Sequence, residues 1–198
     1  MSFKYSVEKD GVTQSLLGTF LQCRQKAKWS LEGWSSKYAS MGLTYGTIGH
    51  AVLERVYLDI QSRKLKSIPS ESQVKVYISG VEKEWKKENP RADRKSLEYL
   101  ELSCLIAEAT IPLYYRYWEK DLKEIKWVAL EHEFKIPYTT SLGQKTILRG
   151  EMDGVYTNPK KTWLFESKFK SRIDEGDLMD TIGFDFQALF YLYALKRI

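Results

Sequence analysis

The residues of this sequence best suited to chemistry lie between positions 147 and 168, in two runs with strand character. Asp153 stands in the first run, directly before a glycine, and the second run ends in Glu166, Ser167 and Lys168. On an extended chain, side chains two positions apart point to the same face, so Glu166 and Lys168 are expected to project together. Antiparallel pairing of the two runs could bring Asp153 alongside. Two carboxylates and an ammonium group at one sheet edge can hold a divalent cation and activate a water molecule beside it.

The same charges also have a purely structural explanation, which is a weak ion pair between Glu166 and Lys168 on an exposed strand. Against it, the apolar residues Trp163, Leu164 and Phe165 directly precede the pair and indicate a buried strand. Charges at the end of a buried strand need a partner or a role. We therefore favour a reactive site.

A histidine from a separate helical pattern is a further candidate for chemistry. Gly46 and Gly49 precede His50, and these two poor helix formers suggest close backbone approach at the start of the helix. His50 and Glu54 are four residues apart and share a helix face. Taken alone, His50 is more often a polar residue hydrogen-bonded at a helix start.

The rest of the pattern predicts helices first, then three strands, then a final helix. The expected helices cover residues 13–29, 46–63, 71–88, 94–122 and 184–197. The expected strands are residues 126–138 and the two runs joined by a turn at Asn158 and Pro159, and residues 171–182 form a polar, acidic loop. Thr13 or Ser15 can cap the first helix, and Pro112 should kink or divide the fourth.

Two further features have structural and functional alternatives. The strand over 126–138 alternates apolar residues from Val128 to Ile136 with Ala129, Glu131 and Glu133, which indicates a half-buried strand. Exposure is the default for Glu131, although it could face the reactive site. A tyrosine and tryptophan cluster at positions 114–118 could stack on nucleic-acid bases, but burial in the core is the more frequent outcome.

Composition bounds the class of protein without deciding its function. A chain of 198 residues favours one domain, and 43% hydrophobic residues with six Trp allow a substantial core. We expect one α/β domain over residues 1–198, with a helical insertion at about 64–122. The net charge of +5 is compatible with a nucleic-acid partner but is common in other proteins. Two cysteines, no membrane-spanning apolar run and no signal-peptide core favour a cytoplasmic protein.

Four motifs in a fixed order make this pattern more specific than any single residue. They are Gly-x-x-Gly-His-x-x-Leu-Glu from Gly46, Arg-Gly-Glu-Met-Asp-Gly-Val from Arg149, Glu-Ser-Lys from Glu166, and Gln-Ala-Leu-Phe-Tyr from Gln187. The set resembles the PD-(D/E)XK nuclease superfamily and, within it, the RecB-type branch, which includes phage exonucleases and iron–sulfur nucleases of CRISPR systems. This resemblance implies a restriction-endonuclease-like core, with a central mixed β-sheet flanked by helices.

The resemblance also implies roles in a metal site. Asp153 and Glu166 would ligate Mg²⁺ or Mn²⁺, with the backbone carbonyl of Ser167 completing the protein ligands and His50 adding the ligand typical of the RecB branch. Lys168 would orient the attacking water or help to deprotonate it, and would stabilise charge on the phosphate. Hard carboxylate oxygens suit these cations.

DNA contact would be mostly electrostatic, with affinity falling steeply as salt rises. By resemblance, Gln187 and Tyr191 would position DNA. The candidate phosphate contacts near the site in sequence are Lys160, Lys161, Lys170 and Arg172. An equally plain explanation of Lys160 and Lys161 is that they keep a hairpin turn soluble.

The sequence also departs from the family in three ways. The family core usually continues with a strand after the Gln-Tyr helix, but this chain stops at Ile198, so that strand is either missing or lies in further sequence. Cys23 stands where iron–sulfur members place their first cysteine, but only Cys104 accompanies it, which predicts no iron–sulfur cluster. Met152 takes the place of the proline that usually precedes the aspartate.

Two functions follow as expectations. The first is a metal-dependent DNA nuclease, an exonuclease acting on DNA ends in recombination, repair or phage DNA processing. The second is a DNA-binding module of the same fold with little or no catalysis. The expected location is the cytoplasm of a bacterial, archaeal or phage-infected cell, without membrane contact. Partners besides DNA would be further copies of the chain, or recombination and replication proteins.

Overall fold

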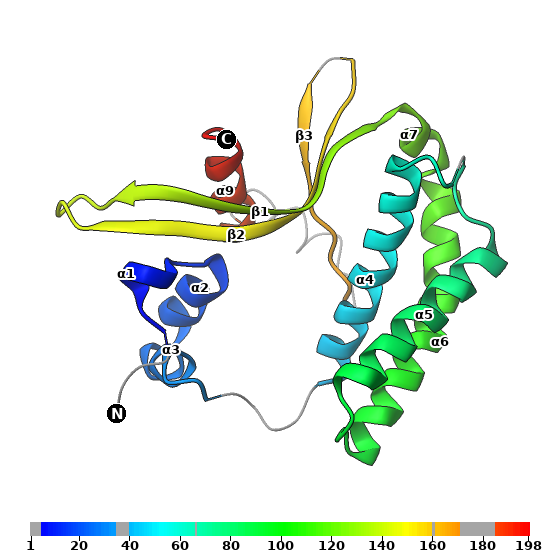
Figure 1. Cartoon of the computed structure of the whole chain (residues 1–198), viewed down its shortest axis with the longest axis horizontal. Coiled ribbons are helices and arrows are strands. Elements are labelled where there is room, and N and C mark those ends of the chain that lie inside the picture. Colours follow the sequence, from blue (N-terminus) through cyan, green and yellow to red (C-terminus); the bar gives the residue numbers. More distant parts are fainter. Residues whose placement is uncertain (1–4, 35–39, 66, 160, 171–184) are drawn as a thin grey trace. The chain divides into compact units, whose positions relative to one another are not determined.

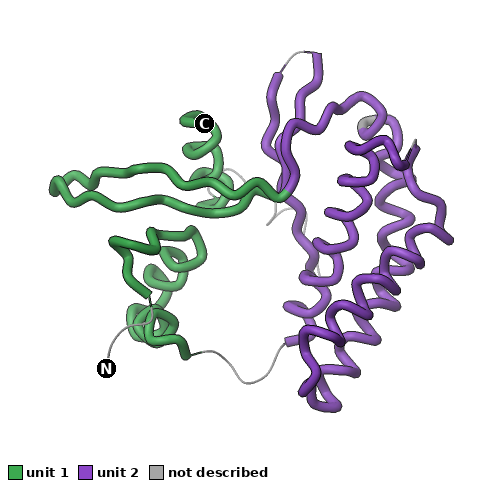
Figure 2. Tube along the Cα trace, viewed as in Figure 1, with its two compact units in different colours: residues 1–37, 131–152, 173–198 green, residues 38–130, 153–172 purple. Residues whose placement is uncertain are grey.

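A computed structural model describes residues 5–34, 40–65, 67–159, 161–170 and 185–198 (Figure 1). The chain divides into two compact units, coloured separately in Figure 2. The first unit comprises residues 1–37, 131–152 and 173–198, and the second comprises 38–130 and 153–172. That the whole chain acts as one domain, with a helical insertion over 64–122, stays a prediction.

The second unit is built on three long helices, α4 (Met41–Gln61), α5 (Glu71–Glu88) and α6 (Arg94–Tyr117), followed by the short α7 (Glu119–Glu124). Apolar residues at helical spacing form its core, and the most deeply buried include Ile48, Val52, Val56, Val74, Ile78, Leu100, Ala107 and Ile111. α5 occupies the predicted range. α4 begins five residues before the predicted start, because the Ser40 hydroxyl caps it by accepting a hydrogen bond from the Leu43 N–H.

α6 continues through Pro112, where the sequence predicted a kink or a division of the helix. The division comes instead at Trp118, between α6 and α7. Proline removes one backbone donor, but Ile111 and Tyr115 on either side of it are buried in the core. Tertiary packing of this kind can hold a helix across a residue that disfavours it. Tyr115 of the aromatic cluster is buried in the core, whereas Tyr117 and Trp118 are 78% and 44% exposed, so the core interpretation holds for only part of the cluster.

The first unit contains α1 (Val7–Asp10), α2 (Gln14–Gln22), α3 (Arg24–Leu31) and α9 (Phe186–Leu195). The single helix predicted over 13–29 is wrong, because Cys23 is extended, with φ −157° and ψ 106°, and separates α2 from α3. Thr13 caps α2 as predicted, its hydroxyl accepting from the Leu16 N–H at 3.2 Å. The predicted apolar stripe of α2 is largely exposed at Phe20 and Leu21.

The described strands form one sheet in the order β1 (Lys126–Thr139), β2 (Lys145–Thr157) and β3 (Thr162–Phe165). β2 and β3 form the predicted antiparallel hairpin, from the pair Thr157 and Thr162 to the pair Gly154 and Phe165. Asn158 closes the turn, its side-chain oxygen accepting from the Lys161 N–H. The protein is therefore an α/β protein, as the sequence predicted. None of the helices among the described residues is long and apolar enough to cross a membrane.

β1 does not follow the single alternation predicted for it. Phe134 and Ile136 are buried as expected, but Val128 is 58% exposed, and the neighbouring Trp127 packs against the core of the second unit instead. The change of face occurs across Glu131, whose φ of 43° is uncommon for a residue with a side chain. A local distortion of this type reverses which residues face inward.

Candidate functional site

The residues predicted to do chemistry come from three elements of the second unit. His50 lies on α4, Asp153 lies on β2, and Glu166, Ser167 and Lys168 follow β3, which ends at Phe165. The expectation that Glu166 and Lys168 lie within the strand is therefore wrong. They still meet, because the Lys168 ammonium lies 2.5 Å from Glu166 Oε1.

Ser167 connects two elements that are distant in sequence. Its N–H and its hydroxyl both donate to Asp153 Oδ2, at 2.7 Å and 2.8 Å. The same hydroxyl oxygen lies 3.1 Å from His50 Nδ1, and this nitrogen lies 3.4 Å from Asp153 Oδ2. Side chains from α4, from β2 and from the segment after β3 therefore meet around one carboxylate oxygen.

These contacts indicate the tautomer of His50. The Ser167 hydroxyl uses its proton on Asp153, so its oxygen is left to accept from a protonated Nδ1. A neutral His50 with the proton on Nδ1 has its lone pair on Nε2. An imidazole nitrogen with a lone pair is a common metal ligand.

Asp153 is held in its charged form. Burial raises its pKa, but hydrogen bonds from His50 and from the backbone and hydroxyl of Ser167 outweigh that effect. The net result is a pKa below the ordinary value for aspartate. Asp153 is thus a carboxylate at neutral pH, as a metal ligand must be.

The pKa of Glu166 is shifted in the opposite direction. Burial raises it, the hydrogen bond from Lys168 lowers it, and the negative charge of Asp153 raises it again, leaving the pKa above its ordinary value. The effect of Asp153 means that the two carboxyl groups are close enough to repel each other. A cation placed between like charges relieves such repulsion.

Phe169 fastens this segment to α4. Its ring contacts Tyr45 and His50 edge-on, with both pairs of ring centroids 5.4 Å apart. A Cβ atom added at Gly49 would fall well inside van der Waals contact with the Phe169 ring, whereas one at Gly46 would meet open space. The prediction of a close approach to the helix is confirmed at Gly49, but an aromatic ring makes the contact instead of backbone. At Gly46 the prediction is wrong.

The remaining predicted residues are those expected to contact DNA. Gln187 and Tyr191 are one turn apart on α9, in the first unit, and Tyr191 is buried with its ring against Phe134. Lys161 and Lys170 are exposed. Lys160 and Arg172 lie outside the described residues.

The side chains of Ser167 and Phe169 were missed by the sequence analysis, which gave Ser167 a role only through its backbone carbonyl. A small hydroxyl residue between two charged ones carries no signal of its own. Helical glycine at position 49 did signal a close neighbour, but only the folded chain identifies that neighbour as Phe169.

The sequence model of the PD-(D/E)XK nuclease superfamily matches residues 12–198. The chain belongs to the PD-(D/E)XK nuclease superfamily. A search among curated proteins finds no match. The family match includes both compact units and all four motifs. It classes this PD-(D/E)XK protein as a nuclease of restriction-endonuclease-like fold, with divalent metal as the general cofactor and DNA as the substrate class.

The donor atoms of this PD-(D/E)XK protein fit a divalent cation by their chemistry. Within the described ranges, no three His, Cys, Asp or Glu side chains are gathered tightly enough to count as a metal-binding group. Even so, Asp153 is held as a carboxylate, Glu166 lies near enough for the negative charge of Asp153 to raise its pKa, and the His50 tautomer has its lone pair on Nε2. Hard carboxylate oxygens with one imidazole suit Mg²⁺ or Mn²⁺.

The cysteines of this PD-(D/E)XK protein are both free thiols. Cys23 is exposed in the first unit, and Cys104 is buried in the second. That the chain binds no iron–sulfur cluster stays a prediction.

Proposed function

We propose that this protein is a deoxyribonuclease of the RecB type that uses Mg²⁺ or Mn²⁺ to hydrolyse phosphodiester bonds, acting as an exonuclease on DNA ends. The observation that carries the proposal is the contact of the Ser167 hydroxyl group with both Asp153 and His50. Glu166 and Lys168, the residues on either side of Ser167 in the sequence, form an ion pair. Phosphodiester hydrolysis needs such groups to position a water molecule and to offset negative charge in the transition state.

The proposed metal ligands are Asp153, Glu166, His50 and the carbonyl of Ser167. When bound, the cation would lower the pKa of a water molecule and neutralise phosphate charge. Asp153 is suited to metal binding in two respects. Its pKa is lowered, which keeps it ionised, and two hydrogen bonds from Ser167 fix its orientation. Fixed orientation matters because ligands that must rearrange bind metal less tightly.

Lys168 is proposed to act on the substrate. Its ammonium group is held 2.5 Å from Glu166 Oε1, which keeps a positive charge beside the two carboxylates. Lys168 remains 44% exposed, so its charge is accessible to an incoming phosphate. From this place it can orient the attacking water and stabilise the oxygens that gain charge.

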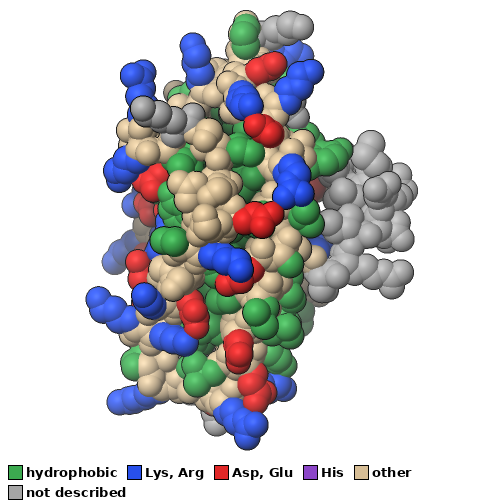
Figure 3. Space-filling view, turned by 90° about the vertical axis from the view of Figure 1, so that its right-hand side faces the viewer, with side chains coloured by type: hydrophobic (Ala, Val, Ile, Leu, Met, Phe, Trp, Pro, Cys, Tyr) green, Lys and Arg blue, Asp and Glu red, His purple; other side chains and the backbone are tan. Residues whose placement is uncertain are grey.

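DNA positioning is assigned to Gln187 and Tyr191, following the RecB-type motif, and to phosphate contacts from Lys160, Lys161, Lys170 and Arg172. Support for the two described lysines is their exposure. On the face shown in Figure 3, Lys and Arg side chains alternate with Asp and Glu and do not form one basic patch. We therefore assign the DNA contacts to the lysines that are near the site in sequence.

The biological setting is proposed from the RecB-type motif order alone. It comprises recombination, repair or phage DNA processing in the cytoplasm, with further copies of the chain or recombination and replication proteins as partners.

A digestion assay on linear and covalently closed circular DNA tests the function. With Mg²⁺ or Mn²⁺ the protein should degrade linear DNA and leave circles intact, and a chelator should stop the reaction. Asp153→Ala and Glu166→Ala should each reduce the rate by about 10³-fold or more, because each removes a ligand of the reacting centre. Cleavage that is unchanged in both variants would show that the site is wrongly assigned. DNA binding without any cleavage would indicate a binding module instead.

A further inference from the structure

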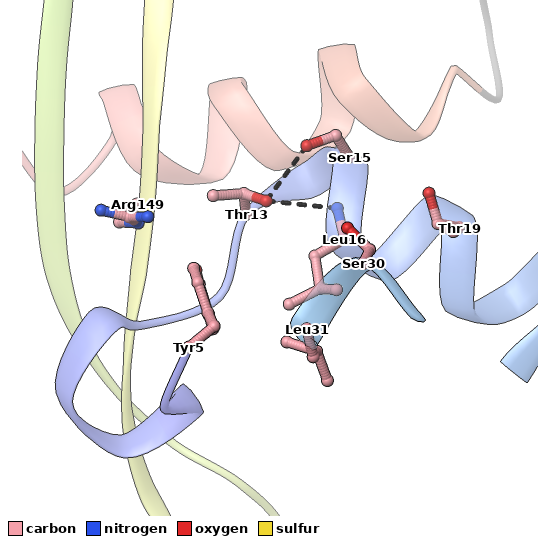
Figure 4. Close-up of a pocket in the computed structure, with 8 residues that line it drawn as sticks. All are labelled: Tyr5, Thr13, Ser15, Leu16, Thr19, Ser30, Leu31 and Arg149. Atoms are coloured by element: carbon pink, nitrogen blue, oxygen red, sulfur yellow. Dashed lines mark hydrogen bonds between the residues drawn. The ribbon is translucent and has the colours of Figure 1, made fainter. Parts of the chain in front are cut away.

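The first unit contains a pocket of about 240 Å³ formed by the N-terminal segment, α2, α3 and β2. Its polar lining comes from Arg149, Thr13, Ser15, Thr19 and Ser30, with Tyr5 beside them (Figure 4). Arg149 approaches from β2, while the small hydroxyl groups come from α2 and α3 and the residue that caps α2. All these residues belong to the first unit, whereas the proposed metal ligands belong to the second.

The backbone fixes Arg149 in this pocket. Its N–H donates to the Val12 carbonyl at 2.9 Å, and the Val12 N–H donates to the Ile147 carbonyl at 2.6 Å. These bonds form a parallel bridge between the N-terminal segment and β2. The pocket therefore has a rigid wall on the side that carries the guanidinium group.

The guanidinium group of Arg149 has donors to spare. Its central carbon lies 5.4 Å from the centre of the Tyr5 ring, which is a cation–π contact. Among the described residues, no carboxylate forms an ion pair with the group, and its buried Nε has no acceptor. A guanidinium group that lines a pocket without a carboxylate partner can donate through its terminal N–H groups to an anion that enters the pocket.

The rest of the lining also favours an anion. No Asp or Glu lines the pocket, and none lies in the first turn of the nine-residue α2. Thr13 Oγ1 lies 3.1 Å from Ser15 Oγ at the N-terminal end of this helix, where backbone N–H groups carry partial positive charge. A carboxylate offers two acceptor oxygens and one negative charge, whereas a phosphate monoester offers three terminal oxygens and up to two negative charges. The phosphate monoester therefore matches the guanidinium and hydroxyl donors better.

We propose that this pocket binds a phosphate monoester, with Arg149 as its charged anchor and the hydroxyls of Thr13 and Ser15 as further donors. The volume lies below the range of about 300–1,000 Å³ typical of drug-sized ligands, which leaves room for a phosphate and a small attached group. Three sources share this chemistry: inorganic phosphate, a mononucleotide and the phosphorylated end of a nucleic-acid strand. This phosphate-binding proposal does not depend on the proposed nuclease activity, because the residues that line the pocket differ from the proposed metal ligands.

Calorimetric titration of the full chain tests the proposal in phosphate-free buffer with a chelator, so that no cleavage occurs. The probes are inorganic phosphate, a deoxynucleoside 5′-monophosphate, and one single-stranded oligonucleotide carrying a 5′-phosphate, a 3′-phosphate or only hydroxyl ends. We expect at least one phosphomonoester to bind, and tighter binding of a phosphorylated oligonucleotide than of its hydroxyl-ended form identifies the strand end as the source. Failure of every phosphomonoester to bind at millimolar concentration overturns the site.

Variants tie the binding to the pocket. Arg149→Gln should weaken it at least tenfold, and Ser15→Ala, at an exposed position with little risk to folding, should weaken it a few-fold. Arg197→Gln is the matched control, because Arg197 also lies in the first unit and stacks on a tyrosine, Tyr193, but lies outside the pocket. Equal binding by folded Arg149→Gln protein, judged by its circular dichroism, or equal losses in Arg149→Gln and Arg197→Gln, would overturn the assignment. If Asp153→Ala loses nuclease activity but binds phosphate as tightly as wild type, the two sites are independent, as proposed.

Discussion

The hydroxyl group of Ser167 lies between the carboxylate of Asp153 and the imidazole of His50, while its own N–H binds the same carboxylate oxygen. This arrangement separates two kinds of contribution from one residue. The backbone contact remains available when serine is replaced by alanine, whereas the link to His50 depends on the hydroxyl group. Single substitutions can therefore distinguish metal ligands from the residue that orients them.

Ser167→Ala should leave a folded protein whose metal affinity or cleavage rate is lower by about 10- to 100-fold, the usual effect of removing a partner that orients a ligand. Asp153 keeps the backbone hydrogen bond but loses one of the contacts that lower its pKa, so that pKa should rise. The acid limb of the pH–rate profile should then move to higher pH. Ser167→Thr, which retains a hydroxyl, is the control. Equal rates and pH profiles for wild type and Ser167→Ala would contradict this role.

At the level of elements, contacts between helices and strands determine where the reactive residues lie. Phe169 packs its ring on α4 at Gly49, and this contact fixes the Glu166–Lys168 segment beside His50. On the far side of β2, a Cβ atom at Gly154 would lie 2.7 Å from the Trp127 ring. Both glycines allow aromatic rings to approach the backbone closely.

Gly49→Ala should destabilise the protein by about 1–3 kcal/mol, because the new methyl group displaces the Phe169 ring from Tyr45 and His50. Gly46→Ala, three residues earlier on the same helix, meets open space and should stabilise it by about 0.5–1 kcal/mol through helix propensity. Urea unfolding of the two variants measures both effects. Stabilisation by both substitutions would show that the ring does not constrain α4.

A second contact between elements joins α4 to α5 and should make stability depend on pH. The Tyr77 hydroxyl donates to Asp59 at 2.7 Å, and this bond is the largest cause of a lowered Asp59 pKa. Because the folded pKa is lowered, the stabilisation is complete above the ordinary pKa of aspartate and is lost as pH falls through the folded value. Burial raises the pKa of Tyr77, and the hydrogen bond to Asp59 raises it further, to about 12. The stabilisation that follows from this raised pKa is complete below the ordinary tyrosine pKa and is lost as the pH rises toward about 12.

Tyr77→Phe should accordingly have a lower urea midpoint than wild type at neutral pH, and the difference should shrink as the pH falls below the ordinary aspartate pKa of about 4. Midpoints at several pH values measure it. Tyr117→Phe is a suitable control, because Tyr117 is 78% exposed. A difference that stays constant down to the lowest pH would mean that the Asp59 contact contributes nothing.

At the scale of the whole molecule, the match of the PD-(D/E)XK family to residues 12–198 covers both units, and the ordered motifs predicted that family from sequence. Local patterns predicted α5, the turn at Asn158 and the Thr13 cap, because neighbouring residues determine them. The extended Cys23 and the change of face at Glu131 were not predictable, since nothing in the residue types there demands them.

The sequence analysis proposed members for the candidate site but could not predict how they are connected. Charge types and their spacing made Asp153, Glu166 and Lys168 candidates, but the link from Ser167 to His50 joins positions 117 residues apart. Such a contact exists only after helix and sheet have packed. The orientation of the reactive groups is therefore a property of the folded second unit.

The central claim is that His50, Asp153 and Glu166 together hold a hard divalent cation, and calorimetric titration of the metal-free protein with Mn²⁺ tests it most directly. The account predicts saturable binding in wild type and in Glu88→Ala, which removes an exposed carboxylate at the end of α5. It predicts binding weaker by at least tenfold in folded Asp153→Ala and Glu166→Ala, and a smaller loss in His50→Ala. Equal Mn²⁺ affinity in wild type, Asp153→Ala and Glu166→Ala would contradict it.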